Sequence, residues 1–190
     1  MKSIKFVSAV AMAAGILVMG SAQAQSANGG TIRVTGSVTD ATCTITGGAG
    51  TDGGTGNVGV ALDPVAATAL AQAGDTANRK PFNLIIGGPG QGSCVNGKIA
   101  DLRFNVASPR IDAATGTLTN ALADQATHTN VQLTNATGTA LDLASPATVI
   151  SSPAIANNTA TIGLGAQYYA TGAATPGLVD TSVQYGVTYR

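Results

Sequence analysis

The sequence predicts an all-β sandwich, and two observations carry that prediction. Short segments in which apolar and polar residues alternate recur along the chain, and period two is typical of strands that bury one face. Clusters of Gly, Asn, Ser and Pro separate these segments; 25 of the 190 residues are glycine. Such frequent clusters of turn-forming residues favour short antiparallel strands over a fold in which strands alternate with long helices.

Four segments show the alternation most clearly. In each, residues two apart are apolar or aromatic and so share one face of a strand. The last segment runs to Arg190, which predicts that the sequence ends within a strand. The predicted inward residues are Ile32, Val34 and Val38; Leu102, Phe104 and Val106; Ile162, Leu164, Ala166 and Tyr168; and Val183, Tyr185, Val187 and Tyr189.

The connections between these segments are mostly glycine-rich. Gly47 to Asn57 predicts a mobile loop, and Gly87 to Gly92 predicts a turn. One short helix is expected at Asp63-Pro64, where the aspartate would cap the first turn, an alanine-rich body follows, and Gly74 stops it.

The N-terminus has the pattern of a secretory signal peptide. Lys2 and Lys5 precede an apolar stretch from Phe6 to Met19, and Ala22-Gln23-Ala24 provides an A-x-A cleavage site. Residues 1–24 are therefore expected to be removed, so that the exported chain begins at Gln25. No later segment approaches the roughly 20 apolar residues of a membrane-spanning helix.

The charge balance excludes some functions. Loss of Lys2 and Lys5 would leave seven of the nine basic residues against nine acidic ones, a formal charge near −2. Nucleic-acid binding normally requires a basic patch, which this composition does not provide. Charged residues make up only 9% of the chain, so the surface is expected to consist mainly of small polar and apolar residues.

The two cysteines, Cys43 and Cys94, both lie in the part expected to be exported. An oxidising compartment would join them in a disulfide. A pair of free thiols is the alternative. A redox or metal role is disfavoured, since there is no CxxC pair and only one histidine.

No catalytic constellation is apparent. Gly48, Gly50 and Gly53 satisfy GxGxxG, but the strand before, the helix after and the downstream acid of a dinucleotide site are missing, so they are interpreted as loop residues. His128 is the only histidine, and the sequence has no GxSxG motif that would supply a nucleophilic serine beside it, so His128 is interpreted as a turn or surface residue. The nine aspartates are scattered and there is no glutamate. We expect no enzyme activity, no metal and no cofactor.

Several motifs occur in the order typical of one family. They are NGGTIRVTGSVTDATC ending at Cys43, the second cysteine about fifty residues on, HTNVQLTNATGTAL from His128, YYATGAATPG from Tyr168, and the ending VQYGVTYR. In this combination the chain resembles type 1 major fimbrial subunits of the chaperone-usher class.

That resemblance implies an incomplete immunoglobulin-like sandwich, occupying residues 41–190, that lacks its final strand. A donor strand from a neighbouring subunit would complete it. Residues 25–40 would be the donor-strand extension, with Ile32, Val34, Gly36 and Val38 as its alternating face. Gly36 would either let the donor backbone approach closely or leave room for a large acceptor side chain.

The ending has a second family feature, a glycine fourteen residues from the end and a penultimate tyrosine, here Gly177 and Tyr189. The resemblance implies that the strand with Val183, Tyr185, Val187 and Tyr189 is where a periplasmic chaperone adds its own strand and holds the Arg190 carboxylate. The final arginine departs from the family's usual neutral ending.

The function implied is a structural subunit of a bacterial fimbria, or pilus, that supports cell adhesion. It would reach the cell surface through the periplasm, with a chaperone, an outer-membrane usher, further copies of itself and a tip adhesin as partners. Two alternatives stay open: a minor adaptor or tip pilin that binds a receptor, and a secreted ligand-binding β-sandwich.

Overall fold

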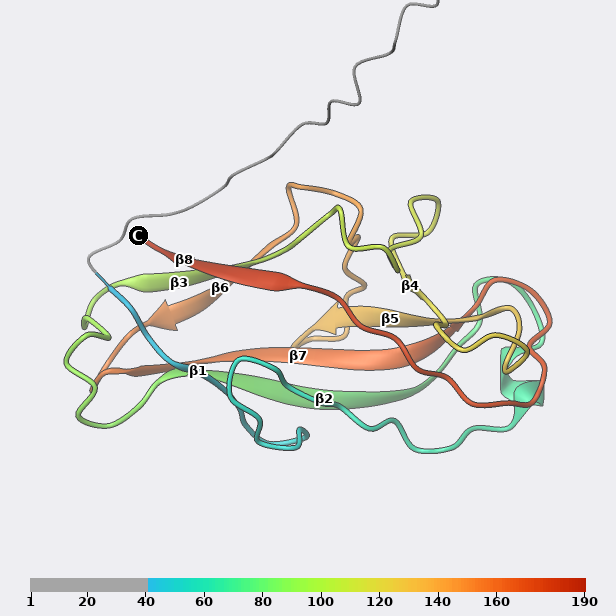
Figure 1. Ribbon diagram of the computed structural model, residues 1–190, viewed down its shortest axis with the longest axis horizontal. Helices are drawn as coiled ribbons and strands as arrows, with labels where there is room; N and C mark the ends of the chain where they lie inside the picture. The colour runs from blue at the N-terminus through green and yellow to red at the C-terminus, as the bar shows by residue number, and fades with distance from the viewer. Residues whose placement is uncertain (1–40) are drawn as a thin grey trace, which may run out of the picture. The chain divides into compact units, whose positions relative to one another are not determined.

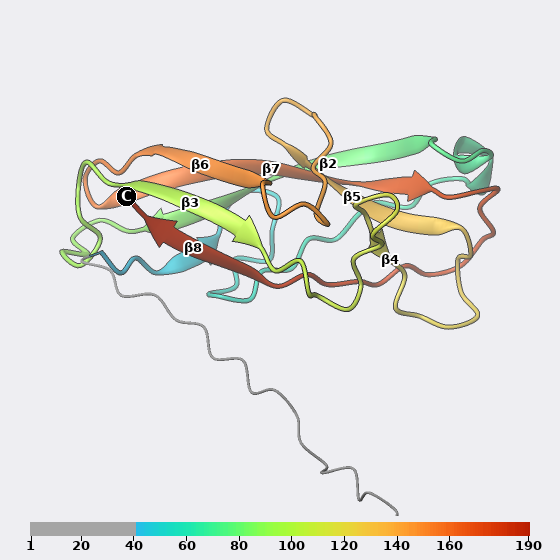
Figure 2. The same cartoon turned by 90° about the horizontal axis from the view of Figure 1, so that it is seen from above.

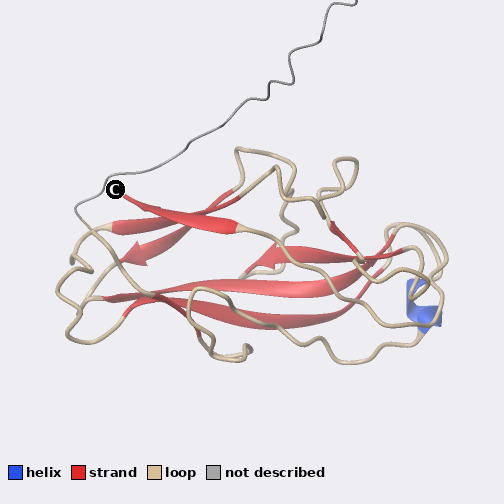
Figure 3. Ribbon diagram, viewed as in Figure 1, coloured by secondary structure: helices blue, strands red, loops and turns tan. Residues whose placement is uncertain are grey.

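The computed structural model describes residues 41–190 (Figure 1). The predicted signal peptide and the predicted donor face of Ile32, Val34, Gly36 and Val38 lie outside this range. The described chain is almost entirely strand and loop (Figure 3). Its elements are β1 (Ile45–Gly47), the 3-10 helix η1 (Ala67–Leu70), β2 (Thr76–Gly87), β3 (Ile99–Phe104), β4 (Leu118–Thr119), β5 (Thr129–Asn135), β6 (Val149–Ala154), β7 (Thr159–Ala170) and β8 (Tyr185–Tyr189).

The strands form two sheets that face each other. One has the order β1-β2-β7-β5-β4 and the other the order β6-β3-β8, and all pairings are antiparallel. Figure 1 shows β8, β3 and β6 above β7 and β2, and in Figure 2, seen from above, the two groups overlap. The fold is an immunoglobulin-like sandwich, which confirms the predicted class.

The core lies between the sheets and comes from the alternating residues of the long strands. Phe82 pairs with Leu164 and Leu84 with Ile162 across β2 and β7. All four side chains are buried, as is Leu102 of β3 in the opposite sheet. Each such side chain contributes about 1.5–3 kcal/mol when it leaves water, and this burial fixes which face of each strand points inward.

A disulfide joins Cys43 to Cys94, with the sulfurs 2.10 Å apart. It connects the residues just before β1 to the loop between β2 and β3. The predicted pairing is confirmed, and the free-thiol alternative is wrong. The bond holds β1, a strand of only three residues, at the edge of its sheet.

The short helix predicted after Asp63-Pro64 is present, but the predicted start and the Asp63 cap are wrong. The observed η1 is a four-residue 3-10 helix that starts at Ala67. Asp63 does not cap it, because its backbone carbonyl accepts a hydrogen bond from the Asn78 side chain at 2.6 Å and its carboxylate lies 3.9 Å from Lys80 Nζ. These contacts tie residue 63 to β2, so the helix begins only after the chain has left the side of this strand.

Val106 was also predicted to face the core, together with Leu102 and Phe104. Instead, β3 ends at Phe104 and Val106 is 45% exposed. Asn105 ends the strand: its side-chain oxygen accepts a hydrogen bond from Ala107 N, and its carbonyl accepts one from Ser108 N. Asparagine favours such turns because its side chain competes with the strand's own hydrogen bonds.

Candidate functional site: an open groove between two sheet edges

Two sheet edges flank an uncovered part of the core. Among the described strands, β1 pairs only with β2 and β8 pairs only with β3. A groove of about 650 Å³ lies between the segments 56–62 and 179–185, and the second of these leads into β8. The outer edge of β1 does not line it, because Gly47 N donates to the Gly54 carbonyl and Gly56 N donates to the Ile45 carbonyl. An extended segment with no strand beside it presents unpaired N–H and C=O groups, so a groove between two such segments can accept a strand.

One wall of the groove is the segment that follows the glycine-rich loop. From Val58 to Leu62 the side chains alternate, with Val58, Val60 and Leu62 half-buried against the core and the residues between them exposed. The preceding loop is closed by Asp52, whose carboxylate accepts hydrogen bonds from Gly54 N and Gly59 N. These bonds lower the Asp52 pKa.

The opposite wall contains the predicted C-terminal face. Val183, Tyr185, Val187 and Tyr189 are all half-buried against the core, as the sequence predicts. Pairing with β3 begins only at Tyr185, so Val183 precedes the strand. The same alternation extends back through Thr181 to Val179, both of which line the groove. The apolar alternation in the sequence does not predict this extension, because Thr181 interrupts the apolar series.

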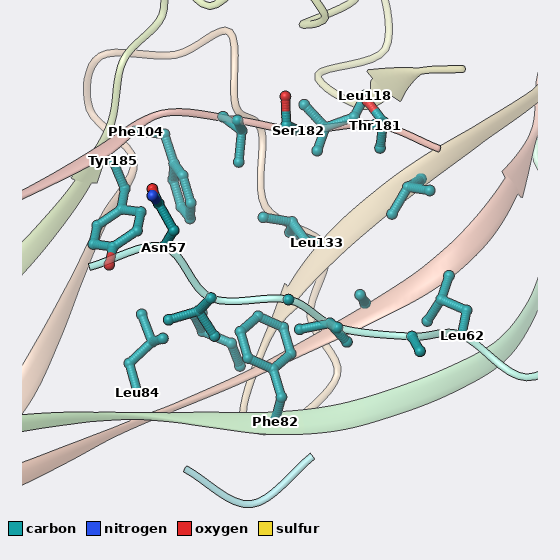
Figure 4. A pocket seen from close by; sticks show the side chains of 18 of the residues that line it. Asn57, Leu62, Phe82, Leu84, Phe104, Leu118, Leu133, Thr181, Ser182 and Tyr185 are labelled. Carbon is teal, nitrogen blue, oxygen red and sulfur yellow. The ribbon is translucent and has the colours of Figure 1, made fainter. Parts of the chain in front are cut away.

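The groove floor is apolar and comes from both sheets. In Figure 4, Phe82 and Leu84 rise from β2 toward the same space that Phe104, Thr181 and Tyr185 face from the other side. Except for Tyr168, which is half-buried, the residues that form this floor are buried or pack against the core; they are Phe82, Leu84, Leu102, Phe104, Leu118, Val131, Leu133, Leu164, Ala166 and Tyr168.

Two tyrosines of β8 connect the two edges. The Tyr185 hydroxyl donates to the Gly56 carbonyl at 2.5 Å, and the Tyr189 hydroxyl donates to the Cys43 carbonyl at 3.4 Å. Burial raises the pKa of both phenols, so both remain protonated donors at neutral pH. The penultimate tyrosine thus binds the β1 edge of its own chain at the end of β8.

Gly177 marks the other end of this wall. A Cβ at this position would lie 2.2 Å from the backbone N of Ala126, a contact that no side chain can make. The close approach is held by neighbouring hydrogen bonds, since Leu178 N donates to Gln125 Oε1 at 3.0 Å and Asn120 Nδ2 donates to the Leu178 carbonyl at 2.9 Å. The glycine therefore positions the start of the segment 179–185.

The described residues contain no cluster of metal-binding side chains. No group of three or more His, Cys, Asp or Glu side chains among residues 41–190 could hold a metal ion. His128 is exposed at a turn with φ +56°, and Gly48, Gly50 and Gly53 lie in the loop after β1 with no helix directly behind them. Within the described range, no helix is long and apolar enough to cross a membrane.

Comparison with known proteins identifies the family. A family model described as type-1 fimbrial protein, A, matches residues 62–190. The chain belongs to the type-1 fimbrial protein family. It is 34% identical to the F17 fimbrial protein of Escherichia coli over 93% of this chain and 96% of that protein. It is 35% identical to the type-1 fimbrial protein A chain of Escherichia coli K12 over 89% of this chain and 88% of that protein.

Other fimbrial proteins are similar over comparable lengths. The major fimbrial subunit SMF-1 of Stenotrophomonas maltophilia is 34% identical over 88% of this chain and 96% of its own. Among solved structures, the type I fimbria protein BPSL1626 of Burkholderia pseudomallei has a TM-score of 0.50 at 23% identity, covering 78% of this chain and 97% of its own. The CupB6 tip adhesin of Pseudomonas aeruginosa has a TM-score of 0.51 at 17% identity, and the match covers 67% of this chain and 34% of the adhesin.

These relatives establish the fimbrial assignment. The protein is a structural subunit of a fimbria, an extracellular fibre on the cell surface, and it assembles with other pilin copies. The family is structural rather than enzymatic. The two structural likenesses support the fold alone.

Proposed function

We propose that this subunit polymerises by donor-strand exchange. Residues 25–40 of one copy would enter the groove of the next, with Ile32, Val34, Gly36 and Val38 facing its floor. The observation that supports this most directly is the groove itself, an apolar floor bounded by the segments 56–62 and 179–185. A soluble chain that exposes such a floor gains stability when another strand covers it.

The chemistry of the two surfaces is complementary. The groove walls point a side chain inward at every second position, and all of these are apolar except Thr181: Val58, Val60 and Leu62 on one side, and Val179, Thr181 and Val183 on the other. The donor segment has the same period. Burial of its three branched side chains would contribute about 5 to 9 kcal/mol before the cost of ordering the segment.

Main-chain hydrogen bonds would add to this burial. A strand inserted between the segments 56–62 and 179–185 would have main-chain groups on each side with which to form a ladder, and those bonds would set direction and register. The inserted strand would join the two sheets along one side of the sandwich, so that each copy completes the core of its neighbour.

Before polymerisation, we infer that a periplasmic chaperone occupies the same groove and an outer-membrane usher receives the subunit. The β8 edge would pair with a chaperone strand beside Val183, Tyr185, Val187 and Tyr189, from the segment that Gly177 positions to the last residue, Arg190. A chaperone strand here would cover the floor during passage through the periplasm. A tip adhesin would accept the first donor strand in the same way.

The test uses full-length chains expressed in a fimbriated cell. Deletion of Gln25 to Thr39 should abolish the SDS-resistant ladder of subunits while the chain still folds with its disulfide. V34D should do the same, because residue 34 faces the groove, whereas T35D on the opposite face of the same segment should leave the ladder. A normal ladder from the deletion would contradict the proposal.

A further inference from the structure

One tyrosine hydroxyl joins the two walls of the groove. Within residues 41–190, the segments 56–62 and 179–185 share no backbone hydrogen bond. Their only side-chain hydrogen bond is the one that the Tyr185 hydroxyl donates to the Gly56 carbonyl at 2.5 Å. Further along β8, the Tyr189 hydroxyl reaches the Cys43 carbonyl at 3.4 Å. The Tyr185 contact is therefore the one direct polar link between the walls of the described chain.

The Gly56 carbonyl belongs to a loop that is itself held in place. Gly56 N donates to the Ile45 carbonyl of β1 at 2.9 Å. On either side of this point, the Asp52 carboxylate accepts hydrogen bonds from Gly54 N at 3.0 Å and from Gly59 N at 2.9 Å. The glycine-rich loop 52–59 is therefore a hydrogen-bonded support for the carbonyl that Tyr185 binds.

The Tyr185 ring lies on the floor side of the groove. Its side chain is on the inward face of β8 and packs against the core, as do those of Val183 and Val187. In Figure 4 the ring extends from the β8 side toward the segment that carries Asn57. Side chains stand roughly perpendicular to a sheet, so a strand placed between the two main chains would lie over this ring rather than replace it.

The reach of the contact matches the width of one strand. Neighbouring strands are about 4.8 Å apart, so two walls that accept a strand between them must be about 9.6 Å apart. A tyrosine side chain, its hydrogen bond and the carbonyl that receives it span roughly 10 Å from one main chain to the other. A shorter hydroxyl side chain would draw the walls too close, and phenylalanine would have no bond with which to hold them.

We propose that Tyr185 is a positioning residue that holds the empty groove open at the width of one strand, with the loop 52–59 as its support. This inference rests on the donor-strand function proposed above. Walls that are already spaced and ordered lose less freedom when a strand enters, and such pre-organisation favours binding. Once a strand is bound, its own ladder joins the walls and makes the tyrosine bond redundant. The contribution of Tyr185 therefore belongs to strand entry, not to strand release.

The test measures entry and release separately. The acceptor is the full-length chain with I32D and V34D, whose own segment is disabled, and the probe is a fluorescent peptide of residues 28–40 followed by anisotropy. Y185F keeps the ring and removes the hydroxyl, so peptide association should be about three- to tenfold slower. Peptide release should stay within about twofold of the parent, because the bound strand joins the walls.

Tyr169 provides the matched control for loss of a tyrosine hydroxyl. It follows Tyr168 in β7 and so lies on the face opposite the groove floor. Y169F should change neither rate. Each acceptor is compared after its Cys43–Cys94 pair is shown to be oxidised, so that only folded chains are measured.

The support role of the loop has its own test. D52A removes the acceptor for Gly54 N and Gly59 N, and it should slow association in the same direction as Y185F. The two residues act on one link, so the D52A/Y185F chain should bind no more slowly than the slower single variant. Additive slowing in the double variant would overturn the role of the loop as the support.

The outcomes separate this role from the donor-strand function. Unchanged or faster association with Y185F, or a loss of affinity that appears only as faster release, would overturn the role of Tyr185 while strand binding stands. Failure of the parent acceptor to bind the peptide at all would overturn the donor-strand proposal itself.

Discussion

Arg190 Nε lies 2.8 Å from Asp101 Oδ2, and the Ser151 hydroxyl donates to the other oxygen of the same carboxylate at 2.6 Å. Arg190 and Ile99 also exchange two backbone hydrogen bonds. Asp101 lies on the opposite face of β3 from Leu102, so this cluster is outside the groove. Arg190, the residue that departs from the family's usual ending, therefore has a partner in its own chain. Its contacts with Asp101 and Ile99 hold this residue, which follows β8, on the sheet.

The Asp101 cluster predicts an acid-sensitive contribution to stability. Burial raises the Asp101 pKa, but hydrogen bonds from Ser151 and Arg190 and the charges of Arg190 and Arg103 outweigh it, so the pKa falls below its ordinary value. A carboxyl with a lowered folded-state pKa stabilises the fold above its unfolded value of about 3.9 and loses that effect as pH falls further.

D101N should therefore lower the free energy of unfolding by about 1 kcal/mol at pH 7, a modest value because Arg190 is largely exposed. The difference from the parent chain should shrink as the pH is lowered from 5 to 3 in urea titrations. D124N, at an exposed turn, serves as the control. A difference that stays constant over this range would show that the charge is not responsible.

Substitution of the inward groove-wall residue Val183 should prevent polymerisation, whereas the same substitution at its exposed neighbour Ser182 should not. V183D would place an unpaired carboxylate against the apolar floor, at a cost on the order of several kcal/mol, and should abolish the SDS-resistant ladder. S182D alters the exposed neighbour and should retain it. Both chains should still contain the oxidised Cys43–Cys94 pair. Loss of the ladder in both variants would mean that charge, not the groove face, is decisive.

A glycine in β7 predicts a local loss of stability. A Cβ at Gly165 would lie 2.5 Å from Thr134 Oγ1 and 2.8 Å from Arg79 Nε. Arg79 crosses β7 here and donates to Thr134 Oγ1 at 3.0 Å and to the Asn135 carbonyl at 2.9 Å. G165A should displace this side chain and lower the free energy of unfolding by about 1–3 kcal/mol.

Gly186 of β8 provides the matched control, because a Cβ there would meet nothing within 4 Å. G186A should change stability by no more than about 0.5 kcal/mol. Denaturant unfolding of the two variants tests the comparison. Equal effects of the two substitutions would show that the Arg79 contact does not determine the result.

The disulfide predicts a larger effect. Cys43 and Cys94 are 51 residues apart, so the bond closes a long loop in the unfolded chain. In the chain-entropy account, removing the bond frees that loop and lowers the free energy of unfolding by about 4 kcal/mol. The C43A/C94A chain should unfold at lower denaturant, and reduction of the parent should reproduce the shift. An unchanged midpoint would mean that β1 stays at its edge without the bond.

Sequence reasoning succeeded where one local pattern decided the structure. The alternation from Val183 to Tyr189 identified the inward face of β8, because a strand has only two faces and burial selects one. It failed where a distant contact decided. Asp63-Pro64 has the local signature of a helix start, yet the Asn78 side chain and Lys80 hold Asp63 in an extended segment. Nothing near residue 63 in the sequence shows those partners.

The sequence by itself determined the all-β class, the disulfide partners and the alternating faces, since each depends on residue types at short, regular spacings. Tertiary structure alone decided that β1 and β8 lie at sheet edges, that residues 56–62 and 179–185 form facing walls, and that Thr181 Oγ1 is buried there without a partner. The physical reason is that a groove is a relation between strands far apart in the chain, and strand spacing in sequence does not specify which strands become neighbours.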